Sequence, residues 1–308
     1  MTHAIEGLWP ALLMPFGTDG QLDIPRTLAQ TSRMLAAGCD GVTLFGTTGE
    51  GLAFSVAERK RVLEAVLDSG VRPDQIIVTI TACALEEAID LGRHAISKGV
   101  TRQLYMPPFF FNHPRDAGVI DCVSQVVKGI TGSANGEGLQ MLLYHFPSLV
   151  NVAFSHAAIA ELVRRHPQHV VGVKDSAGDL QHSLGLVKAF PQLSILVGSE
   201  PHIAEVMRAG GAGSVNGMSN VAPHLLRRVM SAPQNVSPAD EKLILDLIRL
   251  MTVLPGMPFV SAYKVGLAEQ SGDDVWLNVR APLTKLEPHE EQAVREVYRA
   301  TNQRFETI

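Results

Sequence analysis

The chain has 308 residues, a formal net charge of −5 and a pI near 6.1, so no basic surplus points to nucleic acid as a partner. Apolar residues make up 46% of the chain, which is enough for a sizeable core in one large domain or two smaller ones. The three cysteines, Cys39, Cys83 and Cys122, lie far apart without a CxxC pair, which argues against a disulfide framework and a thiolate zinc site.

The amino terminus, MTHAIEGLWPALLMPF, lacks the basic segment that opens a secretory signal peptide. No apolar run reaches the length of a membrane span. Together with the scattered cysteines, which suit a reducing compartment, these features predict a cytoplasmic protein that does not enter a membrane.

Short apolar runs and helical patterns alternate along the first two-thirds of the chain. The runs predict strands at Gly7–Phe16, Gly41–Phe45, Ile76–Ile80, Arg102–Met106, Gln140–Tyr144, Val170–Val173, Ser194–Val197 and Gly213–Asn216. The intervening spacing predicts helices at Ile24–Ala37, Val56–Leu67, Leu85–Lys98, Arg115–Lys128, Ser155–Arg165, Asp179–Phe190 and Pro201–Ala209. Alternating strands and helices imply a parallel sheet, and eight such units predict an α/β fold of the (β/α)8 TIM-barrel type. A doubly wound open sheet is the alternative.

The pattern changes after Val221, where only helices are predicted. They span Ser237–Leu254, Pro258–Gln270 and Pro288–Asn302. We therefore expect a barrel domain over residues 1–230 and a C-terminal helical extension over 231–308. The glycine-rich segment Gly129–Gly138 is expected to be a surface loop.

A lysine stands at the end of the sixth predicted strand, in the stretch Val170–Ser176. An amine at the mouth of a barrel is partly desolvated, which favours its neutral form, and a neutral amine attacks a ketone to form an imine. Lys174 is therefore a candidate nucleophile. The alternative is a lysine that merely extends its head group from a strand end into water.

Other polar groups follow the strands at the same predicted rim, where TIM barrels carry their chemistry. The turn Gly46–Gly51 could hold a carboxylate or a phosphate on its backbone, or could be a plain glycine turn. Tyr144 ends the fifth strand and could relay a proton, or could be a core tyrosine with a satisfied hydroxyl. A lysine, a tyrosine and two threonines on one rim are the groups that imine chemistry on a 2-keto acid requires.

Three motifs carry a resemblance to a known family. They are Gly46-Thr47-Thr48-Gly49-Glu50, Tyr144-x-x-Pro147 and Gly172-Val173-Lys174-Asp175. Together they resemble the signature of the dihydrodipicolinate synthase / N-acetylneuraminate lyase family of class I aldolases, in matching order from about Leu8 to Pro223. The resemblance implies a TIM barrel with a helical extension, a homotetramer, and no metal or organic cofactor.

The resemblance also implies roles for single residues. Lys174 would form the Schiff base and Tyr144 would relay protons. Thr47 and Thr48 match the family's carboxylate-binding turn. Gly198 and Val215 match positions whose backbone carbonyls face the bound keto acid. The partners implied are a small keto acid and an aldehyde.

Three departures from the synthase pattern bear on the substrate. Leu149 stands where the synthase has an arginine for the carboxylate of its second substrate, and a leucine cannot make that contact. Phe111 replaces a tyrosine that reaches into a neighbouring subunit's site, and His145 replaces an asparagine. We therefore favour a lyase or dehydratase acting on pyruvate or a 2-keto-3-deoxy acid. The alternative is 4-hydroxy-tetrahydrodipicolinate synthase, which condenses pyruvate with aspartate semialdehyde.

Two hypotheses from other classes are weighed against the aldolase. A metal-dependent barrel enzyme would need ligands at the rim, but the pair His166 and His169 is predicted at a helix end away from it. A non-catalytic keto-acid sensor would fit the hydroxyl lost at Phe111. Intact Lys174 and Tyr144 argue against a sensor, because a pure binder needs no nucleophile.

Overall fold

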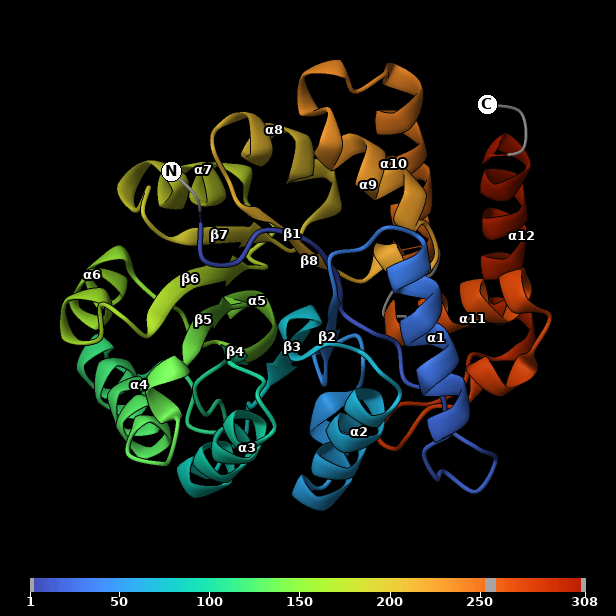
Figure 1. Ribbon diagram of the computed structural model, residues 1–308. Coiled ribbons are helices and arrows are strands. Elements are labelled where there is room, and N and C mark those ends of the chain that lie inside the picture. Colours follow the sequence, from blue (N-terminus) through green and yellow to red (C-terminus); the bar gives the residue numbers. More distant parts are fainter. Residues whose placement is uncertain (1–2, 253–258, 306–308) are drawn as a thin grey trace.

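Eight parallel strands form the centre of the molecule and helices surround them (Figure 1). The computed structural model describes residues 3–252 and 259–305. The strands are β1 (Gly7–Pro10), β2 (Val42–Leu44), β3 (Ile76–Thr79), β4 (Arg102–Tyr105), β5 (Gln140–His145), β6 (Val170–Asp175), β7 (Ser194–Val197) and β8 (Gly213–Asn216). Their order is β1-β8-β7-β6-β5-β4-β3-β2, and a bridge between Ala11 and Thr43 brings the two edges together. The TIM barrel is confirmed, and the doubly wound alternative is wrong.

Helices cover the outside of this barrel, and their bounds follow the predicted pattern closely. They are α1 (Ile24–Ala36), α2 (Val56–Asp68), α3 (Leu85–Ser97), α4 (Asp116–Thr131), α6 (His156–Arg165), α7 (Leu180–Ala189) and α8 (Ile203–Arg208). The start of helix α2 shows why a capping motif in the sequence predicts where a helix begins. The Ser55 hydroxyl accepts from the Glu58 N–H, and the Glu58 carboxylate accepts from the Ser55 N–H, which forms a complete capping box.

Some predicted bounds were wrong. The first strand ends at Pro10 rather than Phe16, and residues 11–16 continue as a buried irregular segment. Helix α4 extends to Thr131, into the segment predicted as a loop. Two helices were missed, the short α5 (Pro147–Val150) and α9 (Pro223–Ser231). The predicted helix ends at Leu254 and Pro258 lie outside the described residues.

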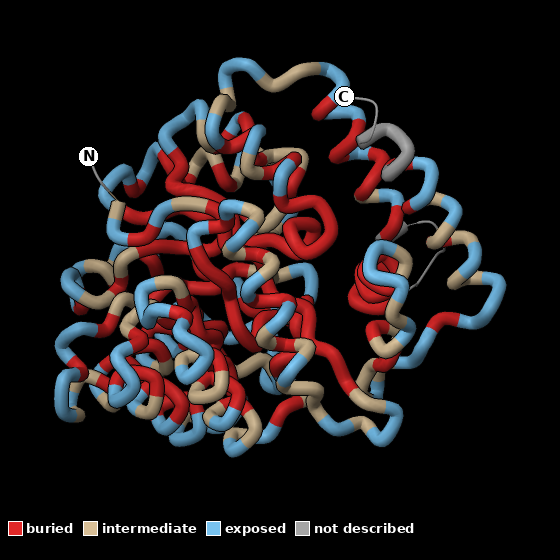
Figure 2. The backbone as a smooth tube through the Cα atoms, turned by 45° about the vertical axis from the view of Figure 1, so that its right-hand side comes forward, coloured by how far each residue is buried: buried red, intermediate tan, exposed pale blue. Residues whose placement is uncertain are grey.

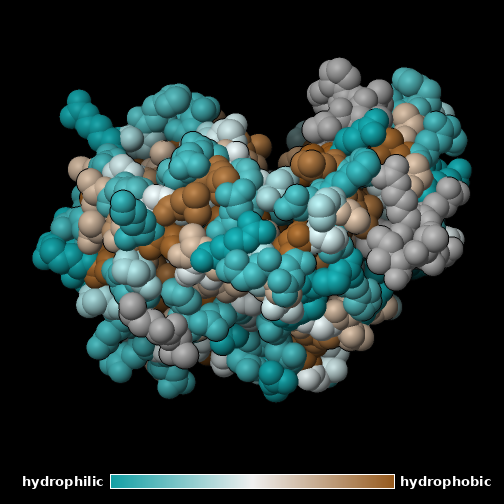
Figure 3. Space-filling model, turned by 90° about the horizontal axis from the view of Figure 1, so that it is seen from above, coloured by the Kyte–Doolittle hydropathy of each residue, from teal (hydrophilic) through white to brown (hydrophobic). Residues whose placement is uncertain are grey.

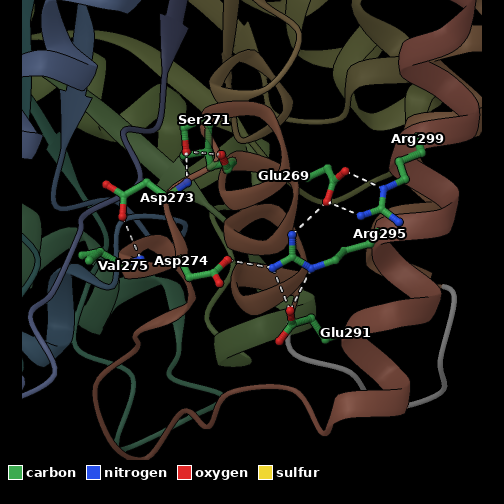
Figure 4. Close-up of polar contacts among 9 residues, drawn as sticks. Glu269, Ser271, Asp273, Asp274, Val275, Glu291, Arg295 and Arg299 are labelled. Atoms are coloured by element: carbon green, nitrogen blue, oxygen red, sulfur yellow. Dashed lines mark hydrogen bonds and ion pairs between the residues drawn. The ribbon is translucent and has the colours of Figure 1, made fainter.

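The C-terminal region is helical, as expected, with α10 (Pro238–Thr252), α11 (Phe259–Ser271) and α12 (Pro288–Phe305). The segment Val260–Ala268 of α11 is buried throughout. Helix α12 is tied to α11 by ion pairs, because Arg295 and Arg299 both bind Glu269 (Figure 4). The boundary at residue 230 stays a prediction.

The buried residues lie in the barrel and on the inward faces of the helices, and exposed residues lie on the outer faces (Figure 2). Seen from above, hydrophilic residues cover much of the surface, with apolar patches between them (Figure 3). Among residues 3–252 and 259–305, no helix has the length and apolar character needed to cross a membrane.

Arg280 joins the C-terminal region to the barrel helices. Its guanidinium binds the Glu58 carboxylate at 2.6 Å and the Ala53 carbonyl oxygen at 3.0 Å. The same group lies over the rings of Phe16 and Phe54. The hydrogen bond from Arg280 lowers the pKa of Glu58 to about 2.

The variant Glu58→Gln tests this link. Glutamine keeps a capping oxygen but loses the charge, so at pH 7 it should lower the free energy of unfolding by about 1–3 kcal/mol. A lowered carboxyl pKa stabilises the fold above the unfolded value, and this contribution disappears as the pH falls from about 4.5 towards 2. Urea unfolding at pH 7 and pH 3 should therefore show a smaller difference from wild type at pH 3. The exposed Glu205 provides the control, Glu205→Gln, and an equal effect there would contradict the prediction.

Candidate active site

A cavity of about 180 Å³ opens at the carboxyl ends of the strands. All six residues predicted from sequence line it: Thr47, Thr48, Tyr144, Lys174, Gly198 and Val215. The structure thus brings together side chains from β2, β5, β6, β7 and β8 or from the segments that follow these strands. This volume suits a small substrate rather than a large ligand.

Lys174 and Tyr144 are held next to each other by strand pairing. They are register partners on β6 and β5, and both are buried. The Lys174 Nζ lies 4.0 Å from the centroid of the Tyr144 ring. Lys174 is only 4% exposed, so the amine is not a head group extended into water.

The Tyr144 hydroxyl forms a hydrogen bond with the Thr47 hydroxyl at 3.0 Å. Either oxygen can be the donor, because each hydroxyl carries one proton and two lone pairs. A proton can therefore pass along this pair in either direction. Tyr144 is thus a tyrosine with a satisfied hydroxyl that is also linked to a second polar group in the cavity.

The turn that carries Thr47 and Thr48 depends on close backbone packing. Gly51 has no room for a side chain, because a Cβ there would lie 1.8 Å from the Phe45 carbonyl oxygen. Glu50 has a left-handed backbone with φ of 55°. This conformation is uncommon for a residue other than glycine, so surrounding contacts must hold it.

Those contacts come from the C-terminal region. The buried Glu50 carboxylate forms an ion pair with Lys264 of α11. It also accepts a hydrogen bond from the main-chain N–H of Arg280 at 3.0 Å. Lys264 also donates to the Asn278 carbonyl oxygen at 2.7 Å. Burial lowers the pKa of Lys264 to about 8. The threonine turn is therefore anchored by a charge pair that spans two distant parts of the chain.

Glu200, which follows β7, lines the cavity as well. Its carboxyl accepts hydrogen bonds from the Met218 N–H at 3.1 Å and the Tyr263 hydroxyl at 3.4 Å. Burial raises the pKa of Glu200. The cavity thus contains a buried acidic group whose two hydrogen-bond donors oppose the effect of burial on its pKa.

Phe259 and Tyr263 bring helix α11 to the same cavity, which the sequence analysis missed. One signal could have found them. Apart from Ser261, Tyr263 and Lys264, the run Val260–Ala268 is apolar, and a helix without a broad polar face is expected to be buried.

Gly198 lies against Ser176, because a Cβ at Gly198 would approach the Ser176 Oγ to 2.3 Å. The Gly198 N–H donates to the Asp175 carbonyl oxygen at 2.7 Å. A side chain at residue 198 would therefore displace the segment that follows Lys174. Whether the Gly198 and Val215 carbonyls face a substrate stays a prediction.

A second, more apolar cavity of about 510 Å³ adjoins the first, and Thr47 and Tyr144 line both. Leu149 lines this second cavity and is 49% exposed. Phe111 lies in the segment after β4 and is 83% exposed. Leu149 and Phe111, two of the three departures from the synthase pattern, are thus both exposed.

The histidine pair considered for a metal lies at the other end of the barrel. His166 is bonded to Ser124, and His169 to the Leu139 carbonyl at the start of β5. His145, in contrast, follows Tyr144, but it does not line either cavity. Its Nδ1 accepts a hydrogen bond from the Phe154 N–H.

Comparison with known proteins identifies the family. Residues 4–301 match the model of the dihydrodipicolinate synthetase family. The chain belongs to this family. A DapA-like lyase from Chloroflexus aurantiacus, itself described as uncharacterized, is 32% identical over 95% of this chain and 96% of its own.

Two solved structures share the fold of this family member. Dihydrodipicolinate synthase from Agrobacterium tumefaciens is 32% identical, with a TM-score of 0.87 over 96% of this chain and 99% of its own. YagE from Escherichia coli K12, solved in complex with pyruvate, is 22% identical, with a TM-score of 0.87 over 97% of this chain and 99% of its own. Because members of the family are lyases of the aldolase type, the protein is an enzyme of this class.

The variant Lys264→Met tests the anchor of the threonine turn. It leaves the Glu50 carboxylate buried without its cation, so the free energy of unfolding should fall by about 3–5 kcal/mol. The double variant Glu50→Gln/Lys264→Met should recover part of this loss, because no uncompensated charge stays buried. Urea denaturation measures both variants. Lys60→Met, which breaks an exposed pair with Asp90, should cost about 0–1 kcal/mol, and a similar loss for both lysines would contradict the prediction.

Proposed function

We propose that this enzyme is a Schiff-base aldolase or lyase that acts on pyruvate or on a 2-keto-3-deoxy acid. The observation that carries the proposal is the buried Lys174 amine 4.0 Å from the Tyr144 ring, with the Tyr144 hydroxyl bonded to Thr47. A buried amine beside a proton-relaying pair is the arrangement that imine formation needs.

In the cleavage direction, the nitrogen lone pair of Lys174 attacks the C2 carbonyl carbon of the keto acid, and a proton moves from the nitrogen to the C2 oxygen to form a carbinolamine. Loss of water from C2 produces the protonated imine on Nζ. The Tyr144 hydroxyl, linked to Thr47, supplies the proton that lets the C2 oxygen leave as water, and its phenolate then removes the proton of the C4 hydroxyl. The C3–C4 bond breaks, its electron pair moves into the imine to form an enamine, and an aldehyde leaves. The reprotonated Tyr144 hydroxyl donates its proton to C3. Water then adds at C2, a proton returns to the phenolate, and the shorter keto acid and free Lys174 are released.

Binding of the keto acid is assigned to the surrounding backbone and hydroxyls. The carboxylate is proposed to bind at Thr47 and Thr48, where two hydroxyls and turn N–H groups are close together. Gly198 and Val215 are proposed to border the keto acid on the opposite wall. No metal or organic cofactor takes part in the proposed steps, because the imine itself draws electrons from the breaking bond.

Intact-mass spectrometry after incubation with pyruvate and borohydride tests the Schiff base. Wild type should gain a single reduced pyruvyl adduct, whereas Lys174→Ala should gain none, because it lacks the amine. An adduct of equal yield on Lys174→Ala would remove Lys174 from the mechanism. A panel of longer keto acids would be tried with the same readout.

Tyr144→Phe is the matched variant for the proton relay. It keeps the amine, so the adduct should still form, although more slowly. Its turnover should fall roughly 10²–10⁴-fold, the usual contribution of a positioned proton donor and acceptor. A turnover near that of wild type would mean that another group moves the proton.

The aldehyde half of the substrate is proposed to lie towards the apolar cavity beside Tyr144. Leu149, Phe109 and Leu283 line this cavity, and they suit an apolar or aromatic aldehyde better than a second carboxylate. Arg280 lines it too, but its guanidinium is already bound to Glu58 and Ala53. The synthase alternative is supported by the 32% identity to the Agrobacterium enzyme. It is weakened by Leu149, because a leucine cannot bind the carboxylate of the second substrate.

The variant Leu149→Arg separates these two functions. If Leu149 excludes a charged acceptor, wild type should condense pyruvate with aspartate semialdehyde poorly. The arginine variant should improve kcat/KM for that aldehyde by roughly tenfold or more, since a charge-assisted contact contributes about 1.5–3 kcal/mol. Coupled assays with both aldehyde classes measure this. Efficient condensation by wild type would make the protein a synthase instead.

A homotetramer in the cytoplasm is proposed from the family resemblance. Phe110 and Phe111 are exposed in the single chain and lie edge to face with ring centroids 5.3 Å apart. Exposed aromatic pairs commonly mark a contact between proteins. Light scattering that reports a single-chain mass would contradict the assembly.

The alternative of a non-catalytic keto-acid sensor would gain support only if the protein bound keto acids without any turnover.

A further inference from the structure

A buried polar cluster lies behind the Lys174–Tyr144 pair, on the outer side of the barrel wall. His145 and Asp175 are the next register partners on β5 and β6, directly after Tyr144 and Lys174. Successive side chains on a strand point to opposite faces, so this second pair points away from the cavity. Neither His145 nor Asp175 lines the cavity at the rim.

The Asp175 carboxylate is fully engaged by its neighbours. Its Oδ1 accepts from the Ala177 N–H at 3.0 Å, and its Oδ2 accepts from the Ser183 hydroxyl at 2.6 Å. The Nδ1 of His182, on α7, lies 2.9 Å from the same Oδ2. One carboxylate therefore ties the end of β6 to the following loop and to helix α7.

His145 extends this cluster to β5. Its ring is stacked on that of His182, with centroids 4.5 Å apart and planes inclined by 14°. Its Nδ1 accepts from the Phe154 N–H at 3.0 Å, which anchors the loop after β5. Burial lowers the pKa of His145 to about 4, whereas the bond to Asp175 raises the pKa of His182. A neutral imidazole is thus stacked on a more basic one that is paired with a carboxylate.

His145, Asp175 and His182 also lie close enough to suggest metal ligation. The geometry favours a hydrogen-bonded unit instead. Parallel stacked rings direct their in-plane lone pairs along parallel planes rather than towards one point, and both Nδ1 atoms already have partners. Tetrahedral metal sites need ligand atoms that converge.

We propose that Asp175, His182 and His145 form a positioning unit that sets the distance and orientation between Lys174 and Tyr144. The inference rests on the proposed function, because it assigns the unit to imine chemistry. Each catalytic side chain is followed by a unit member on its own strand, and the unit ties the two strand ends and their loops together. A change in the unit should therefore move the amine relative to the tyrosine without touching the substrate.

Two substitutions of His182 test the proposal. His182→Leu keeps the branched shape but removes the Nδ1 donor, and His182→Asn restores a donor at nearly the same place. The leucine variant should lower kcat and the rate of borohydride trapping with pyruvate by roughly 10–100-fold, as expected for reacting groups displaced by about 1 Å. The KM for the keto acid should change by less than about threefold, because no binding group is lost. The asparagine variant should recover most of the rate.

Controls separate positioning from general damage. Gln181→Leu alters the neighbouring exposed residue of the same helix and should leave the rates unchanged. Circular dichroism and thermal unfolding check that each variant folds. If His182→Leu does not fold, Ser183→Ala removes another donor to Asp175 and should produce a smaller fall in kcat, again at an unchanged KM.

The outcomes distinguish the inference from the proposed function. If wild type forms no adduct, the proposed function is contradicted. The positioning inference can then still be tested by itself, by comparing the Lys174–Tyr144 arrangement in crystal structures of the two His182 variants. An unchanged Lys174–Tyr144 arrangement in the leucine variant would overturn it. Borohydride trapping of His182→Leu at the wild-type rate would overturn the inference as well. Equally slow trapping of His182→Leu and His182→Asn would also overturn it. Activity lost in EDTA and restored by zinc would replace the positioning unit with a metal centre.

Discussion

The ion pair between Glu50 and Lys264 is the constraint on which the arrangement at the rim depends. Two charges are removed from water there, and such a pair is stable only when both partners stay and further hydrogen bonds satisfy them. The Arg280 N–H and the Asn278 carbonyl supply those bonds. The pair also holds Glu50 in its left-handed conformation, and therefore holds the threonine turn. The C-terminal helices are thus part of the active-site support, although they contribute few of the side chains around the cavity.

Strand pairing solves the second positioning problem, which is to place an amine next to a proton relay. Tyr144 and Lys174 are register partners, so their side chains enter the barrel side by side. Alternation then sends His145 and Asp175 outward, where a hydrogen-bonded network can form without competing for substrate. The same two strand ends thus carry the proposed reactive groups inside and the proposed positioning unit outside. A shift in register by one residue would exchange the two sets and destroy both.

The sequence predicted the features that depend on local chemistry. Alternating apolar runs and helices were enough to predict the barrel. Lys174 and Tyr144 became candidates through their places at strand ends, and the family resemblance supplied their proposed roles. Contacts between distant segments could not be predicted in this way. Nothing near Glu50 in the sequence indicates that Lys264 neutralises it. Likewise, nothing near His182 in the sequence indicates its hydrogen bond to Asp175. Helix α9 is different, because the helical apolar spacing of Leu225, Leu226, Val229 and Met230 is present in the sequence and local pattern alone predicts it.

In the proposed mechanism, the meeting of the two cavities lets one relay serve both halves of the reaction. Thr47 and Tyr144 line the small cavity with Lys174 and also the larger apolar one with Leu149. Their hydroxyls are bonded to each other, so a proton removed on one side can be delivered on the other. In the proposed mechanism the cavity with Lys174 holds the keto acid, whereas the apolar cavity beside Leu149 receives the aldehyde. A change at Leu149 would then alter the choice of aldehyde without altering Lys174, Tyr144 or Thr47.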